Sequence, residues 1–153
     1  MTVTLTEVEQ RLAHVVAAER TRANRAAGVV DQQLSPEAAQ QVELTGIGAE
    51  LAYARLMNVY PDLTVAPRAG GADVWWAGLG VDVKGTERPH GRLLARPTKL
   101  TQDGVTVYAL MTGPFPTYTF RGQVPASTLL QARHLMDLGH GPTYAMSQPE
   151  LCA

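Results

Sequence analysis

The spacing of apolar residues along the chain changes near residue 63. Before this point apolar residues recur at helical intervals and predict a helix over residues 5–27. Ser35-Pro36-Glu37 is typical of a second helix start, with a capping serine and a proline in the first turn. This helix is expected to run to about Asn58, with a bend or a restart at Gly46-Ile47-Gly48. The N-terminal part of the chain is therefore predicted to be helical.

Beyond that change apolar and polar residues alternate, which is the pattern of strands with one buried face. Pro125-Ala126-Ser127 then opens a last helix, predicted over residues 128–138, and residues 143–146 add a short strand. Consecutive strands with helices at both ends indicate an α+β fold with a central mixed β-sheet flanked by helices. The main strands are predicted at residues 63–66, 72–77, 80–86, 105–112 and 118–124.

The length of 153 residues fits one domain over residues 1–153. A chain of this size buries about two-thirds of its unfolded surface, so it needs neither a disulfide nor a structural metal to fold. We divide it into an N-terminal helical region (1–43), a core (44–138) and a C-terminal tail (139–153).

The sequence has no feature that points to a membrane or to secretion. The longest apolar run, Val107 to Met111, is far shorter than the roughly 20 residues of a membrane-spanning helix. The first thirty residues are rich in charges and contain no apolar stretch of signal-peptide length. The single cysteine, Cys152, suits a reducing compartment. We therefore expect a cytoplasmic protein without a membrane partner.

The formal net charge is −1, but its distribution is uneven. Residues 1–62 hold eight acids and five bases, whereas residues 84–99, the basic segment, hold five bases and one acid, Glu87. A basic loop on a near-neutral body is compatible with contact to nucleic-acid phosphates, and a solvated surface loop is the alternative. The candidate nucleic-acid-binding residues are Arg88, His90, Arg92, Arg96 and Lys99.

Two of the predicted strands, joined at Gly78-Leu79, bring acidic and basic side chains together. A two-residue hairpin there pairs Trp75 with Asp82 and Asp73 with Lys84. Alternation puts these four side chains on one face, with the valines of both strands on the other. Converging carboxylates need a cation or a shared proton, and oxygen ligands suit Mg²⁺. The alternative is a surface hairpin with an ion pair between Asp73 and Lys84.

Glu50 lies in the apolar stripe of the second predicted helix. Ile47 and Ala54 are three and four residues away from it, so its carboxylate is expected to point toward the core. A buried carboxylate is costly without a partner, so a cation or a lysine should lie close to it. The alternative is an ion pair with Arg55 or Arg68.

These elements follow an order that is known from one nuclease superfamily. The chain places Gly48-Ala49-Glu50 on a helix, Gly71-Ala72-Asp73 at the entry of a strand and Val81-Asp82-Val83-Lys84 on the next strand. This order resembles the PD-(D/E)xK superfamily, the restriction-endonuclease-like fold, over about residues 44–86. Ala72 departs from the pattern, because many members have proline there. In overall style the chain also resembles proteins of phages and mobile elements.

The resemblance implies a role for each matched residue. It implies that Asp73, Asp82 and the Val83 carbonyl oxygen ligate Mg²⁺, with Mn²⁺ as a substitute. It implies that Lys84 positions the attacking water and stabilises the transition state. Glu50 would bind the metal through water or bind a second metal. The implied catalytic residues are therefore Glu50, Asp73, Asp82 and Lys84.

The implied function is hydrolysis of nucleic-acid phosphodiester bonds by metal-activated water. The resemblance favours DNA as the substrate without excluding RNA, and an endonuclease over an exonuclease. Many relatives act as dimers, so a homodimer is compatible with it. The alternative is a non-catalytic nucleic-acid-binding or assembly protein that keeps the nuclease fold. Retention of all four candidate residues speaks against that alternative.

Overall fold

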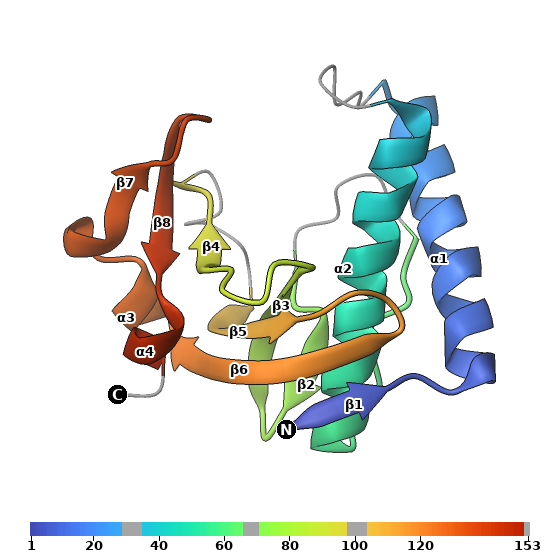
Figure 1. The fold of residues 1–153 in the computed structure, drawn as a ribbon, viewed down its shortest axis with the longest axis horizontal. Coiled ribbons are helices and arrows are strands. Elements are labelled where there is room, and N and C mark those ends of the chain that lie inside the picture. The colour runs from blue at the N-terminus through green and yellow to red at the C-terminus, as the bar shows by residue number, and fades with distance from the viewer. Residues whose placement is uncertain (29–34, 66–70, 98–103, 152–153) are drawn as a thin grey trace.

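Two long helices pack side by side on one face of a curled sheet (Figure 1). The computed structural model describes residues 1–28, 35–65, 71–97 and 104–151. After a short strand, β1 (Thr2–Thr4), come α1 (Glu7–Ala26) and α2 (Pro36–Met57). Thr6 caps α1 and forms a capping box with Glu9, which fixes where this helix begins.

Helix α2 continues through Gly46-Ile47-Gly48, so the predicted restart there is wrong. Gly48 serves packing instead, because a Cβ atom at this position would lie 2.1 Å from the Tyr118 hydroxyl. Tyr118 is buried, and its hydroxyl donates a hydrogen bond to Thr45 O (3.2 Å). The glycine therefore allows α2 to lie close to the sheet.

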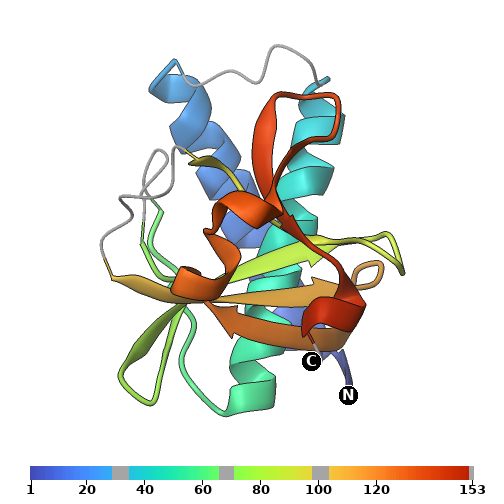
Figure 2. The same ribbon diagram turned by 90° about the vertical axis from the view of Figure 1, so that its left-hand side faces the viewer.

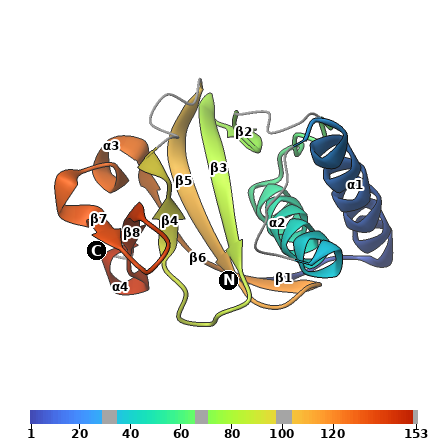
Figure 3. The same cartoon turned by 90° about the horizontal axis from the view of Figure 1, so that it is seen from above.

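The central sheet has five strands in the order β1-β6-β5-β3-β2. β3 and β5 run parallel, and the other neighbouring strands run antiparallel, so the sheet is mixed. Figure 3 shows β3 and β5 side by side, between the two long helices and the C-terminal elements. Besides β1, the strands are β2 (Val74–Trp76), β3 (Leu79–Thr86), β5 (Val105–Thr112) and β6 (Thr117–Pro125).

A smaller C-terminal layer covers the other face of the sheet (Figure 2). It contains a three-stranded sheet in the order β4-β8-β7 and three short helices. Val81 and Val83 pack into the core beneath α1 and α2, whereas Tyr108 and Leu110 pack beneath the C-terminal layer. The elements of this layer are β4 (Leu93–Ala95), α3 (Ala126–Leu129), the 3₁₀ helix η2 (Ala132–His134), β7 (Leu135–Asp137), β8 (Pro142–Met146) and α4 (Gln148–Leu151).

The structure confirms the predicted fold class, an α+β fold with a central mixed sheet flanked by helices. The strand over residues 105–112 has its predicted bounds. The helix predicted over residues 128–138 is wrong, because this stretch holds the end of α3, η2 and β7. Leu135–Asp137 pairs with β8, and this tertiary pairing replaces the helix. The restriction-endonuclease-like core and the three-region division stay predictions.

The strand predicted from Leu63 to Ala66 is also wrong over the residues that the structure describes, 63–65. Asp62 Oδ1 accepts a hydrogen bond from Thr64 N (2.8 Å). Such a local bond between side chain and backbone competes with strand pairing. Ala66 lies outside the described residues.

Within the part of the chain that the structure describes, no helix combines the length and the apolar character needed to cross a membrane.

Candidate active site

The candidate site is built on the β2–β3 hairpin, whose turn differs from the predicted one. The turn residues are Ala77 and Gly78, with φ of 50° and 79°. Two positive φ angles are what a type I′ hairpin turn requires. Trp75 consequently pairs with Gly80, so the predicted pairing of Trp75 with Asp82 is wrong by two residues. A shift of two keeps every side chain on its predicted face, and the valines of both strands are buried in the core.

Asp73 lies just before β2, and its carboxylate reaches the backbone of β3. Its Oδ2 accepts a hydrogen bond from Val83 N (2.6 Å), and its own N–H donates to Val81 O (2.8 Å). These two contacts lie on either side of Asp82 along β3. The backbone of the hairpin therefore holds the two aspartates as neighbours.

Asp82 and Lys84 lie on the same face of β3. Lys84 Nζ is 2.5 Å from Asp82 Oδ1, and the side chains of Lys84 and Asp82 are 26 % and 4 % exposed. Tyr108 is the neighbour of Asp82 on β5, and burial together with the Asp82 charge raises the pKa of Tyr108 to about 12. The ion pair of Lys84 is thus formed along one strand, not across the hairpin with Asp73 as the surface-hairpin alternative predicts.

Glu50 points into the molecule from α2, as its place in the apolar stripe predicts. Its partner is Arg20 of α1, whose Nη1 lies 3.2 Å from both carboxylate oxygens. The predicted alternative partner Arg55 pairs with Glu9 instead (2.9 Å), and Arg68 lies outside the described residues. Sequence reasoning missed Arg20, because only the packing of α1 on α2 brings it to Glu50.

Arg20 also links Glu50 to the hairpin. Its Nη2 donates a hydrogen bond to Asp62 O (3.0 Å), and Asp62 N donates to Asp73 O (2.7 Å). One guanidinium therefore holds the helix carboxylate and the segment that pairs with Asp73. We call Glu50, Asp73 and Asp82, which α2 and the hairpin bring together, the acidic cluster.

The pKa values show that these carboxylates interact. Burial raises the pKa of Glu50 well above its ordinary value, and the Asp73 charge raises it further, against the opposing effect of Arg20. Burial and the Asp82 charge raise the pKa of Asp73 to about 6, although the hydrogen bond from Val83 N and the Lys84 charge oppose this. Arg20 and Lys84 therefore offset only part of the cost of burying Glu50 and Asp73.

The donor atoms of the acidic cluster fit a hard divalent cation. Mg²⁺ takes one or two protein carboxylates and completes its shell with water and phosphate oxygens. Asp73 and Asp82 supply neighbouring carboxylates, and the backbone of Val83 is fixed beside them by its hydrogen bond to Asp73. A larger cage is not preformed: the described residues contain no group of three or more His, Cys, Asp or Glu placed to hold a metal.

Strand β3 ends at Thr86, and the part of the basic segment that follows is held by contacts of Glu87 and of its backbone. Glu87 accepts hydrogen bonds from Thr45 Oγ1 (3.2 Å) and Gln41 Nε2 (3.3 Å) of α2. Gln148 Nε2 donates to the carbonyl oxygens of Pro89 (2.8 Å) and Gly91 (3.0 Å). The predicted phosphate-binding residues Arg88, His90, Arg92 and Arg96 are all exposed, and Lys99 lies outside the described residues.

Comparison of the chain with protein-family models, with curated proteins and with solved structures finds no match in any of the three. No relative therefore assigns a role to the acidic cluster, and only its own geometry and chemistry bear on its function.

Proposed function

We propose that the protein is a Mg²⁺-dependent nuclease that hydrolyses DNA phosphodiester bonds, with Glu50, Asp73, Asp82 and Lys84 as its catalytic residues. The observation that carries this proposal is the placement of Asp73 beside Asp82, which is paired with Lys84. Glu50 lies close enough for the charge of Asp73 to raise the pKa of Glu50. Burying these carboxylates together costs folding free energy. Perturbed groups of this kind cluster at functional sites.

A divalent cation held by Asp73 and Asp82 would supply Lewis-acid chemistry, polarising the phosphate and lowering the pKa of a water molecule. The hydrogen bond from Val83 N keeps the Asp73 carboxylate oriented toward β3. The Lys84 ammonium is partly exposed beside Asp82, where it can stabilise negative charge that develops on the phosphate oxygens. Arg20 holds the Glu50 carboxylate in place near Asp73 and Asp82.

The rest of the substrate would lie along the exposed charges of the basic segment. Arg88, Arg92 and Arg96 are exposed and can contact phosphates without first breaking a buried pair. We propose an endonuclease that acts in the cytoplasm, with a homodimer as a compatible assembly. RNA cleavage is the second activity that the same chemistry would support.

The experiment that tests this proposal measures cleavage of plasmid and single-stranded DNA with Mg²⁺, Mn²⁺ or EDTA. The parent protein should cut with either metal and not in EDTA, and Asp82→Asn should lose activity while keeping its fold by circular dichroism. Glu7→Gln, which removes an exposed acid at the start of α1, is the matched control and should cut at the parent rate. DNA binding by the parent without cleavage would replace the nuclease by the non-catalytic alternative.

A further inference from the structure

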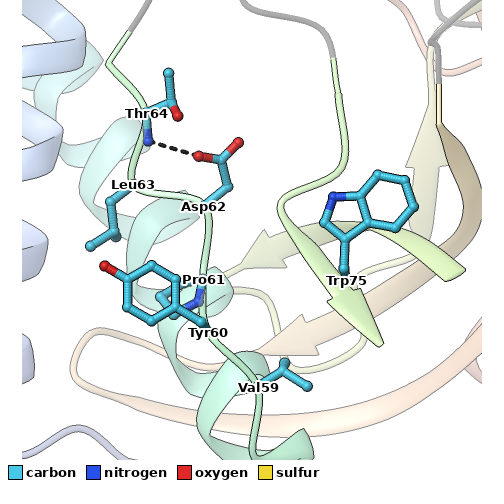
Figure 4. A pocket seen from close by; sticks show the side chains of 7 residues that line it. All are labelled: Val59, Tyr60, Pro61, Asp62, Leu63, Thr64 and Trp75. Carbon is cyan, nitrogen blue, oxygen red and sulfur yellow. Dashed lines mark hydrogen bonds between the residues drawn. The ribbon is translucent and has the colours of Figure 1, made fainter. Parts of the chain in front are cut away.

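An open groove of about 720 Å³ lies between the segment that follows α2 and strand β2 (Figure 4). Both aromatic side chains that line it are strongly exposed: Trp75 is 58 % exposed and Tyr60 is 81 % exposed. The residues that line the groove are Val59, Tyr60, Pro61, Asp62, Leu63, Thr64 and Trp75.

The segment that lines the groove is joined to the acidic cluster through backbone contacts. Pro61 pairs with Val74, and Asp62 N donates a hydrogen bond to Asp73 O (2.7 Å). Trp75 follows Asp73 by two residues. A strand whose phosphate reached Asp73 would therefore have its neighbouring nucleotides within the span of this groove.

The polar wall of the groove suits a base more than a phosphate. Asp62 Oδ1 accepts a hydrogen bond from Thr64 N (2.8 Å), which holds the carboxylate in the wall of the groove. An ionised carboxylate repels phosphate but accepts hydrogen bonds from the amino group of a base such as cytosine. The exposed indole of Trp75 offers a flat face for stacking, which every base can use.

We propose that this groove binds an unpaired nucleobase of a nucleic-acid strand, stacked on Trp75, next to the scissile phosphate. The inference rests on the proposed nuclease function and adds the substrate class, which is DNA with an unpaired strand at the cut. A fully paired duplex keeps its bases stacked on one another, so it cannot offer a base to the groove without local opening.

Tryptophan fluorescence tests binding in the groove separately from cleavage. The chain has two tryptophans, and Trp76→Phe leaves Trp75 as the only indole. We would titrate this variant in EDTA with a ten-nucleotide deoxycytidine oligonucleotide and with a ten-base-pair duplex. The single strand should quench Trp75 at lower concentration than the duplex. Trp75→Ala should weaken binding of the single strand about tenfold, as expected for the loss of one stacked base.

The matched control is Val8→Ala, which removes an exposed apolar side chain from α1 and should bind the oligonucleotide like the parent. Unchanged Trp75 fluorescence at saturating oligonucleotide, or equal affinity of Trp75→Ala and parent, would overturn the groove assignment. Sedimentation of the protein without oligonucleotide gives a further test. Self-association that Trp75→Ala abolishes would overturn the assignment too, because a second copy would then occupy the groove.

The two proposals fail in different ways. A protein that cuts DNA with Mg²⁺ but shows no Trp75 quenching retains the nuclease function and loses the groove. A protein whose Trp75 is quenched by the oligonucleotide but that cuts no DNA retains the groove as a nucleic-acid site and loses the nuclease function.

Discussion

The acidic cluster and the basic segment carry opposite charges, and the fold places them in opposite environments. In the acidic cluster the Asp82 side chain is 4 % exposed, and the carboxylates contact Val83 N, Lys84 and Arg20. In the basic segment the arginines are exposed, and the anchoring contacts come from Glu87 and from backbone carbonyls.

This difference separates the energetic roles of the two regions. Buried charges are costly to desolvate, so each change in the acidic cluster should alter stability, chemistry or both. Exposed charges contribute little to folding and act on a distant partner through a field that salt screens. The following changes break or sharpen this comparison, from the largest expected effect to the smallest.

Lys84→Met should have the largest effect, on the chemical step. Methionine keeps most of the volume of the lysine stem and removes the charge beside Asp82. Loss of a donor to transition-state charge should slow single-turnover cleavage about 10²-fold or more. Metal affinity should hold or rise, because a competing positive charge is gone. Cleavage at the parent rate would make Lys84 a structural partner of Asp82.

Arg20→Gln should destabilise the fold by about 2 kcal/mol, because it leaves the Glu50 carboxyl without its cation. The matched control is Arg22→Gln, whose exposed ion pair with Glu19 should be worth less than about 0.5 kcal/mol. Urea unfolding measures both. The double variant Arg20→Gln with Glu50→Gln should recover stability, and a failure to recover would show that Arg20 acts through other contacts.

Asp73→Asn should stabilise the metal-free protein by about 1 kcal/mol at pH 7.5 and by almost nothing at pH 4. The rise in pKa from 3.8 to about 6 corresponds to about 3 kcal/mol, and the weaker hydrogen bond from Val83 N to a neutral amide offsets part of this gain. The folded-state pKa of Asp73 is raised to about 6, so the parent loses stability as the pH rises from about 4 to about 6. Asparagine removes that loss and can still accept the hydrogen bond from Val83 N. Urea unfolding in EDTA at the two pH values measures the gain, and equal destabilisation at both would contradict it.

Neutralising Arg88, Arg92 and Arg96 together should leave the fold and the metal affinity unchanged. It should flatten the salt dependence of DNA binding by up to about 0.9 logarithmic units for each phosphate that these side chains no longer neutralise. Arg11, Arg22 and Arg25 of α1 are also exposed, and neutralising them removes the same charge as a control. If both triple variants give the parent slope, the basic segment is a solvated surface and DNA approaches by another face.

The sequence predicted the elements whose local patterns and tertiary partners agree. The strand over residues 105–112 is mostly apolar and pairs with a neighbouring strand on both sides, and its predicted bounds were right to the residue. The prediction of a helix over residues 128–138 was wrong, because a local helical pattern cannot reveal that Leu135–Asp137 pairs with β8. The predicted hairpin register was wrong by two residues, because Ala77 adopts a positive φ in the turn, which a residue with a side chain does not favour.

For the candidate site, spacing was enough to find Asp73, Asp82 and Lys84, since a shift of two residues does not change the face of a strand. Glu50 followed from the apolar stripe of its helix. Arg20 did not follow, because nothing near it in the sequence shows which helix it faces. Contacts along one element can thus be predicted from spacing, whereas contacts between elements need the packing.

Calorimetric titration with Mg²⁺ at pH 7.5 tests the central claim most directly, namely that the acidic cluster is a cation site. At this pH the Asp73 carboxyl, with its pKa of about 6, is ionised. The parent and the Glu7→Gln control should bind Mg²⁺ with equal affinity, and Asp73→Asn and Asp82→Asn should each bind it at least tenfold more weakly. No binding to the parent, or undiminished binding to both aspartate variants, would contradict the account.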